Sequence, residues 1–205
     1  MQNDTRDKNK YFAFESLDTY FHEYIEQLKS SLGAVDQMEM IKAQGSIERT
    51  MQYGGRIFVA GNGGSSAIAE HLTCDFEKGC HTKRGSLVTH ALSSNMALLT
   101  AIGNDLGYSQ VFSYQLETQK LHGEDVVILI SSSGNSPNIV EAAQFSVACD
   151  ATLIGFTGFD GGKLKALCDI SLHVPFHNYG IVEDCHQAMM HILAQSIYLS
   201  TKSLG

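Results

Sequence analysis

Short apolar runs alternate with helical segments along most of the sequence, and this alternation constrains the fold more than any other feature. The apolar runs lie at Arg56–Ala60, Ser86–Leu92, Asp125–Ile130, Ala151–Thr157 and Ile170–Val174. Helices are expected at Ser65–Lys78, Asn95–Ile102, Pro137–Ala148, Gly162–Leu167 and Val182–Leu199. Strands that alternate with helices form parallel sheets with helices on both faces. The sequence therefore predicts an α/β fold with a doubly wound, five-stranded parallel sheet, whose ligands bind at the carboxyl ends of the strands.

The region ahead of the first strand is helical throughout. Between Tyr11 and Tyr53, apolar residues recur at three- and four-residue steps, and Gly33 divides the region into two amphipathic helices. The first stripe consists of Leu17, Tyr20, Phe21, Tyr24, Ile25 and Leu28. A stripe of this kind packs on its own domain, packs between subunits, or does both. The sequence does not favour one kind of packing over the other. The expected organisation is a flexible tail (1–10), N-terminal helices that serve oligomerisation (11–55) and one α/β domain (56–205).

Composition excludes several classes of protein. With 14 Lys+Arg against 22 Asp+Glu, the net charge is −8, which disfavours a broad basic surface for nucleic acid. The polar first ten residues lack the apolar core of a signal peptide, and no apolar run approaches the length of a membrane span. The cysteines form no CxxC pair, and we interpret them, including Cys74, as small core thiols in a reducing compartment. We therefore expect a cytoplasmic protein that binds neither nucleic acid nor membrane.

Two polar loops follow predicted strands and have the composition of anion-binding loops. They are Gly61-Asn62-Gly63-Gly64-Ser65 and Ser131-Ser132-Ser133-Gly134-Asn135-Ser136. Glycines let backbone N–H groups approach an anion, a helix N-terminus adds a favourable partial charge, and serine hydroxyls donate further hydrogen bonds. The triphosphate-binding GKS or GKT signature is absent, and the first loop lacks the third glycine of a dinucleotide fingerprint. We expect a phosphate site and no nucleotide cofactor.

Two helical segments carry spaced imidazoles and carboxylates. His71 and Asp75 are four residues apart and share a helix face; Glu183 and His191 are eight apart and point in similar directions, with Gln187 between them. Two imidazoles and two carboxylates are a suitable ligand set for Zn²⁺ or another divalent first-row metal. The set forms only if the two helices meet, which the sequence alone does not establish. We expect His186, half a turn away from His191, to lie outside it.

The two loops, together with Thr157-Gly158-Phe159-Asp160-Gly161-Gly162, resemble those of the SIS (sugar isomerase) domain, and within it the phosphoheptose isomerase family. The resemblance spans about Arg56 to Leu199 and includes the helical N-terminal extension. It implies a flavodoxin-like sheet and the conversion of sedoheptulose 7-phosphate into D-glycero-D-manno-heptose 7-phosphate, for bacterial heptose biosynthesis in lipopolysaccharide or capsule. It also implies a homotetramer with sites between subunits, and in some members one zinc ion per subunit.

The resemblance assigns roles to particular residues. It implies a phosphate cradle at Ser131, Ser132, Ser133 and Ser136, with Ser65 nearby. It implies sugar contacts at Asn62, Gly63, Gly64, Asn104, Asp105 and Glu183. The metal ligands would be His71, Asp75, Glu183 and His191, with Asp75 as the catalytic base and His191 as the acid. At two of these positions the chain departs from the family, with Asp75 in place of Glu and Glu183 in place of Gln.

The departures leave alternatives. Isomerisation moves a proton between adjacent carbons, which one carboxylate and one imidazole can accomplish, while a metal can polarise the carbonyl instead. If a metal binds both Asp75 and His191, the base is Glu183, a bound water or another group. The shorter Asp75 also fits an isomerase of a different sugar phosphate. A third alternative is a non-catalytic sugar-phosphate sensor or protein-binding relative; the ionisable groups at all four positions argue against it.

Overall fold

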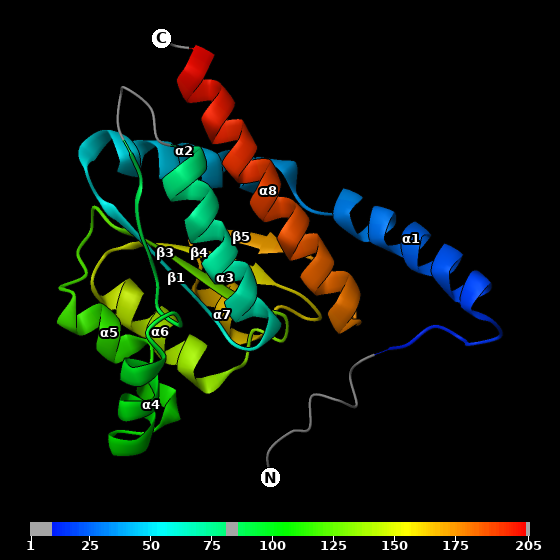
Figure 1. Cartoon of the computed structure of the whole chain (residues 1–205), viewed down its shortest axis with the longest axis horizontal. Helices are drawn as coiled ribbons and strands as arrows, with labels where there is room; N and C mark the ends of the chain where they lie inside the picture. The colour runs from blue at the N-terminus through cyan, green and yellow to red at the C-terminus, as the bar shows by residue number, and fades with distance from the viewer. Residues whose placement is uncertain (1–9, 81–85, 204–205) are drawn as a thin grey trace.

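A computed structural model describes residues 10–80 and 86–203 of the 205-residue chain (Figure 1). The predicted tail therefore lies, except for Lys10, outside the described residues. The strands of the structure are β1 (Arg56–Gly61), β2 (Val88–Ala91), β3 (Val126–Ser131), β4 (Thr152–Thr157) and β5 (Ile170–His173). Its α-helices are α1 (Leu17–Gly33), α2 (Gln37–Tyr53), α3 (Gly64–Cys74), α4 (Met96–Asp105), α5 (Ser113–Thr118), α6 (Pro137–Ala148), α7 (Gly162–Leu167) and α8 (Tyr179–Ser203). A π-helical turn, η2 (Asp75–Gly79), extends α3, and a short 3₁₀ helix, η3 (Tyr108–Gln110), precedes α5.

The five strands form one sheet in the order β2-β1-β3-β4-β5, and every neighbouring pair is parallel. This confirms the doubly wound sheet predicted from the alternating pattern. The strand order changes direction between β1 and β3, which lie side by side in the middle of the sheet. In open α/β sheets such a switch point opens a crevice at the carboxyl ends of the strands, and ligands bind there.

Alternate residues of the central strands face two separate cores. Ile57 and Val59 of β1 pack with α2, α3 and α8 on one face, while Phe58 and Ala60 pack with α4 to α7 on the other. All four side chains are fully buried. Strands buried on both faces are continuous apolar runs rather than alternating ones, which is why their positions were predictable.

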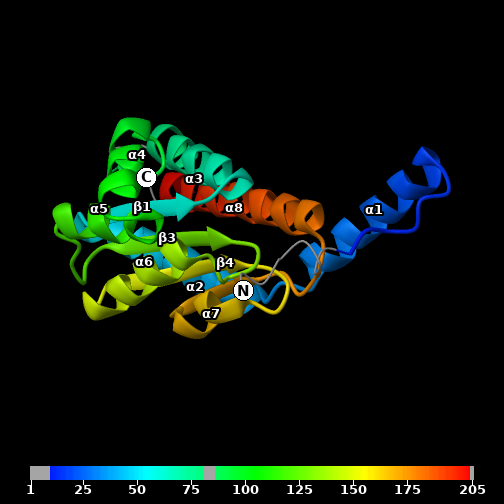
Figure 2. The same cartoon turned by 90° about the horizontal axis from the view of Figure 1, so that it is seen from below.

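The N-terminal helices differ in how they meet the rest of the chain. Helix α2 belongs to the core, since Ala43 and Ile47 are fully buried against the sheet and α8. Helix α1 contacts α8 but projects away from the sheet (Figures 1 and 2). The hydroxyl of Tyr24 donates a hydrogen bond to Asp184 at 2.7 Å, which fastens α1 to the start of α8.

The apolar stripe of α1 is divided between the two kinds of packing that its sequence allows. Tyr24 and Leu28 pack against the core, whereas Leu17, Phe21 and Ile25 are 75%, 59% and 43% exposed. These three residues follow one another at four-residue steps, so they form a continuous apolar ridge on the projecting helix. One side of the stripe is used within the chain, and the other has no cover within the part of the chain that the structure describes.

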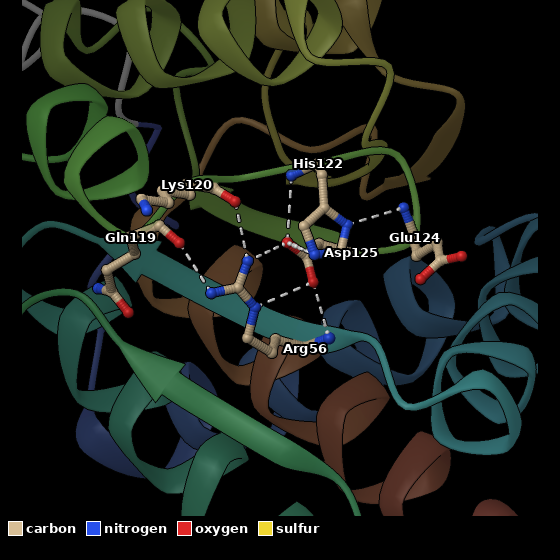
Figure 3. Close-up of polar contacts among 6 residues, drawn as sticks. All are labelled: Arg56, Gln119, Lys120, His122, Glu124 and Asp125. Carbon is tan, nitrogen blue, oxygen red and sulfur yellow. Dashed lines mark hydrogen bonds and ion pairs between the residues drawn. The ribbon is translucent and has the colours of Figure 1, made fainter.

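A buried ion pair holds the amino-terminal edge of the sheet (Figure 3). The Arg56 guanidinium donates to both carboxylate oxygens of Asp125, at 3.2 and 2.6 Å, and to the carbonyls of Gln119 and Lys120. Asp125, which is fully buried, also accepts hydrogen bonds from the backbone amides of Arg56 and His122. Burial alone would raise the pKa of Asp125, but these hydrogen bonds and the Arg56 charge outweigh it and lower that pKa.

The structure corrects three local expectations. The helix expected to reach Lys78 is α-helical only to Cys74, where a wider π turn takes over. The segment between α4 and β3 contains η3 and α5, neither of which was predicted. Cys74 is exposed, so its interpretation as a core thiol is wrong: it follows Thr73 on the outer side of α3, while Leu72 and Phe76 occupy the core. All five cysteines are free.

Among the described residues, no helix is both long enough and apolar enough to cross a membrane.

Candidate functional site

The serine loop, Ser131 to Ser136, follows β3 and leads into the N-terminus of α6. Ser131 and Ser132 are buried, and the Ser131 hydroxyl lies 3.4 Å from that of Ser136. The Ser132 hydroxyl oxygen is buried without a hydrogen-bond partner in the described part of the chain. Buried polar groups are usually paired, so the unpaired Ser132 hydroxyl, in the loop that leads to α6, is a donor that a ligand could pair. These features fit the predicted phosphate cradle.

The glycine-rich loop, Gly61 to Ser65, follows β1 and is held by amides rather than by charge. Asn62 and Asn138 exchange two amide hydrogen bonds of 2.9 Å, and the Tyr108 hydroxyl donates to Asn62 at 2.9 Å. Asn138 lies in α6 and is buried, so it ties this loop to the helix that follows the serine loop. Ser65 is also buried. Sequence reasoning missed Tyr108 and Asn138, because nothing in their local sequence indicates that they meet Asn62.

Asn104 and Asp105 lie at the end of α4, where both are exposed. The Asn104 amide donates a hydrogen bond to Asp105 at 2.7 Å. Tyr108 in the next turn links this segment to Asn62. The predicted pair is therefore connected to the glycine-rich loop only through a neighbour, and its contact with a sugar stays a prediction.

Three of the four predicted metal ligands meet between α3 and α8. His71 Nε2 lies 3.6 Å from Asp75 Oδ1, and His191 Nε2 lies 3.9 Å from Asp75 Oδ2. One ligand atom from each residue falls within 4.8 Å of the other two. The side chains of His71, Asp75 and His191 are 48%, 32% and 41% exposed, so a solvent-borne molecule can reach them. We call these three residues the His-Asp-His cluster.

Gln187 lies inside this cluster. Its amide nitrogen is 2.9 Å from Nδ1 of His71 and 3.3 Å from Nε2 of His191. When that nitrogen donates, both imidazole atoms act as acceptors, and the proton of a neutral His71 ring lies on Nε2, the atom that faces Asp75. A metal ion needs free lone pairs, so its binding would require Gln187 to release the imidazoles.

Glu183, the fourth predicted ligand, is not part of the cluster formed by the described residues. It is half-buried one turn before Gln187 on α8, with its carboxylate against Gly64. A Cβ atom at Gly64 would lie about 2.4 Å from that carboxylate, so a side chain at position 64 would require the end of Glu183 to turn away. Burial, with a smaller contribution from Asp184, raises the pKa of Glu183.

His186 lies outside the site, as expected. It is fully buried behind the end of β4, where its Nε2 is 3.1 Å from the carbonyl oxygen of Thr157. Its Nδ1 has no partner among the described residues. Burial lowers the pKa of His186 to about 4, so it stays neutral near pH 7.

The donor set of the cluster fits a divalent first-row metal such as zinc. Two imidazole nitrogens and one carboxylate oxygen are ligands that zinc uses in catalytic sites, where three protein ligands leave one position open. The structure therefore contains a possible metal site of three residues rather than four.

Comparisons with known proteins agree with this arrangement. Residues 20–158 match the family model of the SIS domain. The phosphoheptose isomerase of Helicobacter hepaticus is 42% identical over 156 residues, which cover 76% of this chain and 79% of that protein. The phosphoheptose isomerase of Trichlorobacter lovleyi is 40% identical over 72% of this chain and 75% of its own length.

A solved structure shows the same likeness in three dimensions. The phosphoheptose isomerase of Neisseria gonorrhoeae superposes with a TM-score of 0.80 at 30% identity, covering 88% of this chain and 96% of that one. Three structural features accompany this similarity. They are a sheet whose order switches between β1 and β3, two loops suited to phosphate, and the His-Asp-His cluster. The chain belongs to the SIS domain family and, within it, to the phosphoheptose isomerases.

Proposed function

We propose that this isomerase interconverts sedoheptulose 7-phosphate and D-glycero-D-manno-heptose 7-phosphate in bacterial heptose biosynthesis. The observation that carries the proposal is the meeting of His71, Asp75 and His191 on helices that begin beside the two loops. An aldose–ketose isomerase needs a site for the phosphate and, further along the sugar, groups that move a proton. The named relatives support the same activity.

The serine loop binds the phosphate in this proposal. Ser131, Ser132, Ser133 and Ser136 supply hydroxyls, and Ser65 lies in the neighbouring loop. The unpaired Ser132 hydroxyl and the N-terminus of α6 favour an anion at this position. Asn62, Gly63 and Gly64 adjoin the sugar, with Asn104 and Asp105 on the far side of Tyr108.

The cluster holds a divalent cation, zinc by our proposal, one per subunit, through His71, Asp75 and His191. A bound cation would act as a Lewis acid toward the substrate carbonyl. Asp75 Oδ1 faces His71 and its Oδ2 faces His191. Without a cation, Asp75 takes a proton from the first carbon of the ketose while His191 protonates the carbonyl oxygen on the second carbon. His191 then takes the proton of the hydroxyl on the first carbon, and Asp75 returns its proton to the second carbon, which gives the aldose. With a cation bound to both Asp75 and His191, the carbon proton would be moved by Glu183, a bound water or another group.

We further propose that the protein is a cytoplasmic homotetramer. The exposed ridge of Leu17, Phe21 and Ile25 supports assembly, because apolar side chains at four-residue steps on a projecting helix need cover. Sedimentation velocity of the purified chain tests this part of the proposal. A monomer at all concentrations would contradict it.

The activity is tested by turnover of sedoheptulose 7-phosphate, with the metal content determined on the same sample. Asp75→Asn and His191→Gln are expected to lose activity by about 10²- to 10⁴-fold, since each removes a proton-transfer or ligating group. His22→Gln, at an exposed imidazole on α1, is the matched control and keeps wild-type activity. Activity measured after chelation, and again after zinc is added back, distinguishes the contribution of the metal from damage to the protein. Wild-type protein that carries metal but does not isomerise this sugar would disprove the proposed substrate.

A further inference from the structure

The side chain of Gln187 lies between the two imidazoles of the His-Asp-His cluster and contacts both of them. It comes from α8, which runs beside α3 (Figures 1 and 2), one turn before His191. Its amide nitrogen is 2.9 Å from Nδ1 of His71 and 3.3 Å from Nε2 of His191. An amide nitrogen carries two protons and accepts no hydrogen bond. Each of its two N–H groups is therefore matched to one imidazole nitrogen.

These two hydrogen bonds determine the state of the three imidazole nitrogens that make contacts within the cluster. His71 Nδ1 and His191 Nε2 each direct a lone pair at Gln187. A neutral imidazole has one N–H and one bare nitrogen, so the proton of His71 lies on Nε2, the atom 3.6 Å from Asp75 Oδ1. A ring nitrogen that carries a proton does not ligate a metal. While Gln187 keeps this position, only the carboxylate of the cluster has lone pairs to offer a cation.

Gln187 has room to leave. It is half-buried, and the side chains of His71, Asp75 and His191 around it are 48%, 32% and 41% exposed. A glutamine side chain turns about three single bonds, and its amide exchanges protein acceptors for water once it faces solvent. Because such an exchange has a modest net cost, Gln187 opposes a cation without blocking it.

We infer that Gln187 is an intramolecular competitor of the metal, which sets how tightly the cluster binds a divalent cation. The inference deepens the proposed function and rests on its metal site. The cluster has two mutually exclusive states. In one, Gln187 donates to both imidazoles. In the other, Gln187 has turned away, and a cation occupies the lone pairs of the imidazoles and of Asp75.

The test is a titration of metal-free protein with zinc, in competition with a chromophoric chelator of known affinity. Gln187→Met has a side chain of similar length and similar helix propensity but donates no hydrogen bond. We expect it to bind zinc about 5- to 100-fold more tightly than the wild type, as for the release of two hydrogen bonds. Gln187→Ala should show a similar gain, which excludes the methionine sulfur as its source.

Gln195→Met is the matched control. It makes the same change at an exposed position of α8, two turns beyond Gln187. Its affinity for zinc should equal that of the wild type. An unchanged affinity in both Gln187 variants would overturn the inference. A weaker affinity would show that Gln187 supplies a ligand instead of competing, and would overturn it as well.

A second measurement observes the imidazole protons of metal-free protein. Nitrogen-15 chemical shifts at pH 8 distinguish ring nitrogens that carry a proton from bare ones. In the wild type we expect the proton of His71 on Nε2 and that of His191 on Nδ1. In Gln187→Met this constraint is lost, so His71 should show a mixture of the two neutral forms. A wild-type His71 with its proton on Nδ1 would contradict the inference.

The inference and the proposed activity can fail separately. Turnover of sedoheptulose 7-phosphate, assayed on the same samples, reports on the activity alone. Protein that binds zinc more tightly without Gln187 but does not isomerise this sugar keeps the inference and rejects the activity. Protein that isomerises the sugar but binds no zinc, in the wild type or in either Gln187 variant, rejects the inference and keeps the activity.

Discussion

Two polar clusters built from the same kinds of residue differ in how completely their hydrogen bonds are satisfied. At the amino-terminal edge of the sheet, the Asp125 carboxylate accepts from the Arg56 side chain and from two backbone amides, and the guanidinium also meets two carbonyls. At the carboxyl-terminal edge, the Ser132 hydroxyl is buried with no partner in the described part of the chain, and the half-buried Glu183 carboxylate lies against Gly64. The first cluster is complete without a ligand, and the second is not.

This difference teaches where stability and function lie. A buried charge whose partners are all protein groups holds elements together, and removing one partner leaves the other uncompensated. Unpaired polar groups cost free energy in the folded chain and regain it when a ligand pairs them. Substitutions at the two clusters should therefore have opposite consequences.

The largest effect on stability is expected for Arg56→Met. It leaves the Asp125 carboxylate buried without its charged partner, and the free energy of unfolding should fall by about 3–5 kcal/mol. Urea denaturation measures it. The double variant Arg56→Met with Asp125→Leu should recover much of the loss, because it removes both charges. A loss below about 1 kcal/mol for the single variant would contradict the structural role.

Acid should destabilise the protein through His186. Its pKa in the folded protein is about 4, below the ordinary value of 6.5. The neutral imidazole therefore makes its full contribution to the free energy of unfolding above pH 6.5. That contribution is lost as pH falls from 6.5 to 4, by up to about 3 kcal/mol. Asp125, whose pKa is lowered, loses its own contribution only at more acidic pH.

Unfolding free energies at pH 7 and pH 4.5 measure this loss. His186→Gln should flatten the dependence, whereas the exposed His22→Gln should not. If His186→Gln is too unstable to measure, His186→Asn offers a smaller amide at the same position. If a folded His186 variant keeps the wild-type dependence of unfolding free energy on pH, that dependence does not come from His186.

Ser132→Ala sharpens the comparison at the serine loop. It removes a buried hydroxyl that has no partner in the described residues, so stability should rise by about 1 kcal/mol. Affinity for inorganic phosphate should fall about tenfold, since a donor to the anion is lost. Thermal unfolding and calorimetric titration on the same sample report the two changes. A loss of stability would show that the hydroxyl is paired within the protein.

The smallest effect on stability is expected for Asp75→Asn in metal-free protein. Its carboxylate is a third exposed and its distances to the two imidazoles are long, so the change should stay within about 0.5 kcal/mol. Urea denaturation of chelated samples measures it. A loss as large as that of Arg56→Met would make the His-Asp-His cluster a structural element rather than a binding site.

The sequence predicts those parts of the fold that depend on local pattern. The runs around Ile57 and Ile128 are apolar because both faces of the central strands are covered, and the loops follow at their carboxyl ends. The pairing of His71 with Asp75 follows from helix spacing alone. Their meeting with His191 depends on two helices becoming neighbours, which requires the sheet order.

The parts that could not be predicted depend on contacts between distant segments. Gln187 bridges the two imidazoles, and Tyr108 reaches Asn62 from a short helix whose sequence carries no periodic signal. The exposure of Cys74 depends on which side of α3 faces the sheet. The separation of Glu183 from the cluster depends on its rotamer and on the absence of a side chain at Gly64.

The contact between Glu183 and Gly64 also couples the two positions over generations. A side chain at position 64 would meet only the flexible end of Glu183, so it would displace that carboxylate rather than the backbone. Shortening residue 183 first would remove the conflict. The effect of a substitution on α3 therefore depends on which residue α8 carries at position 183.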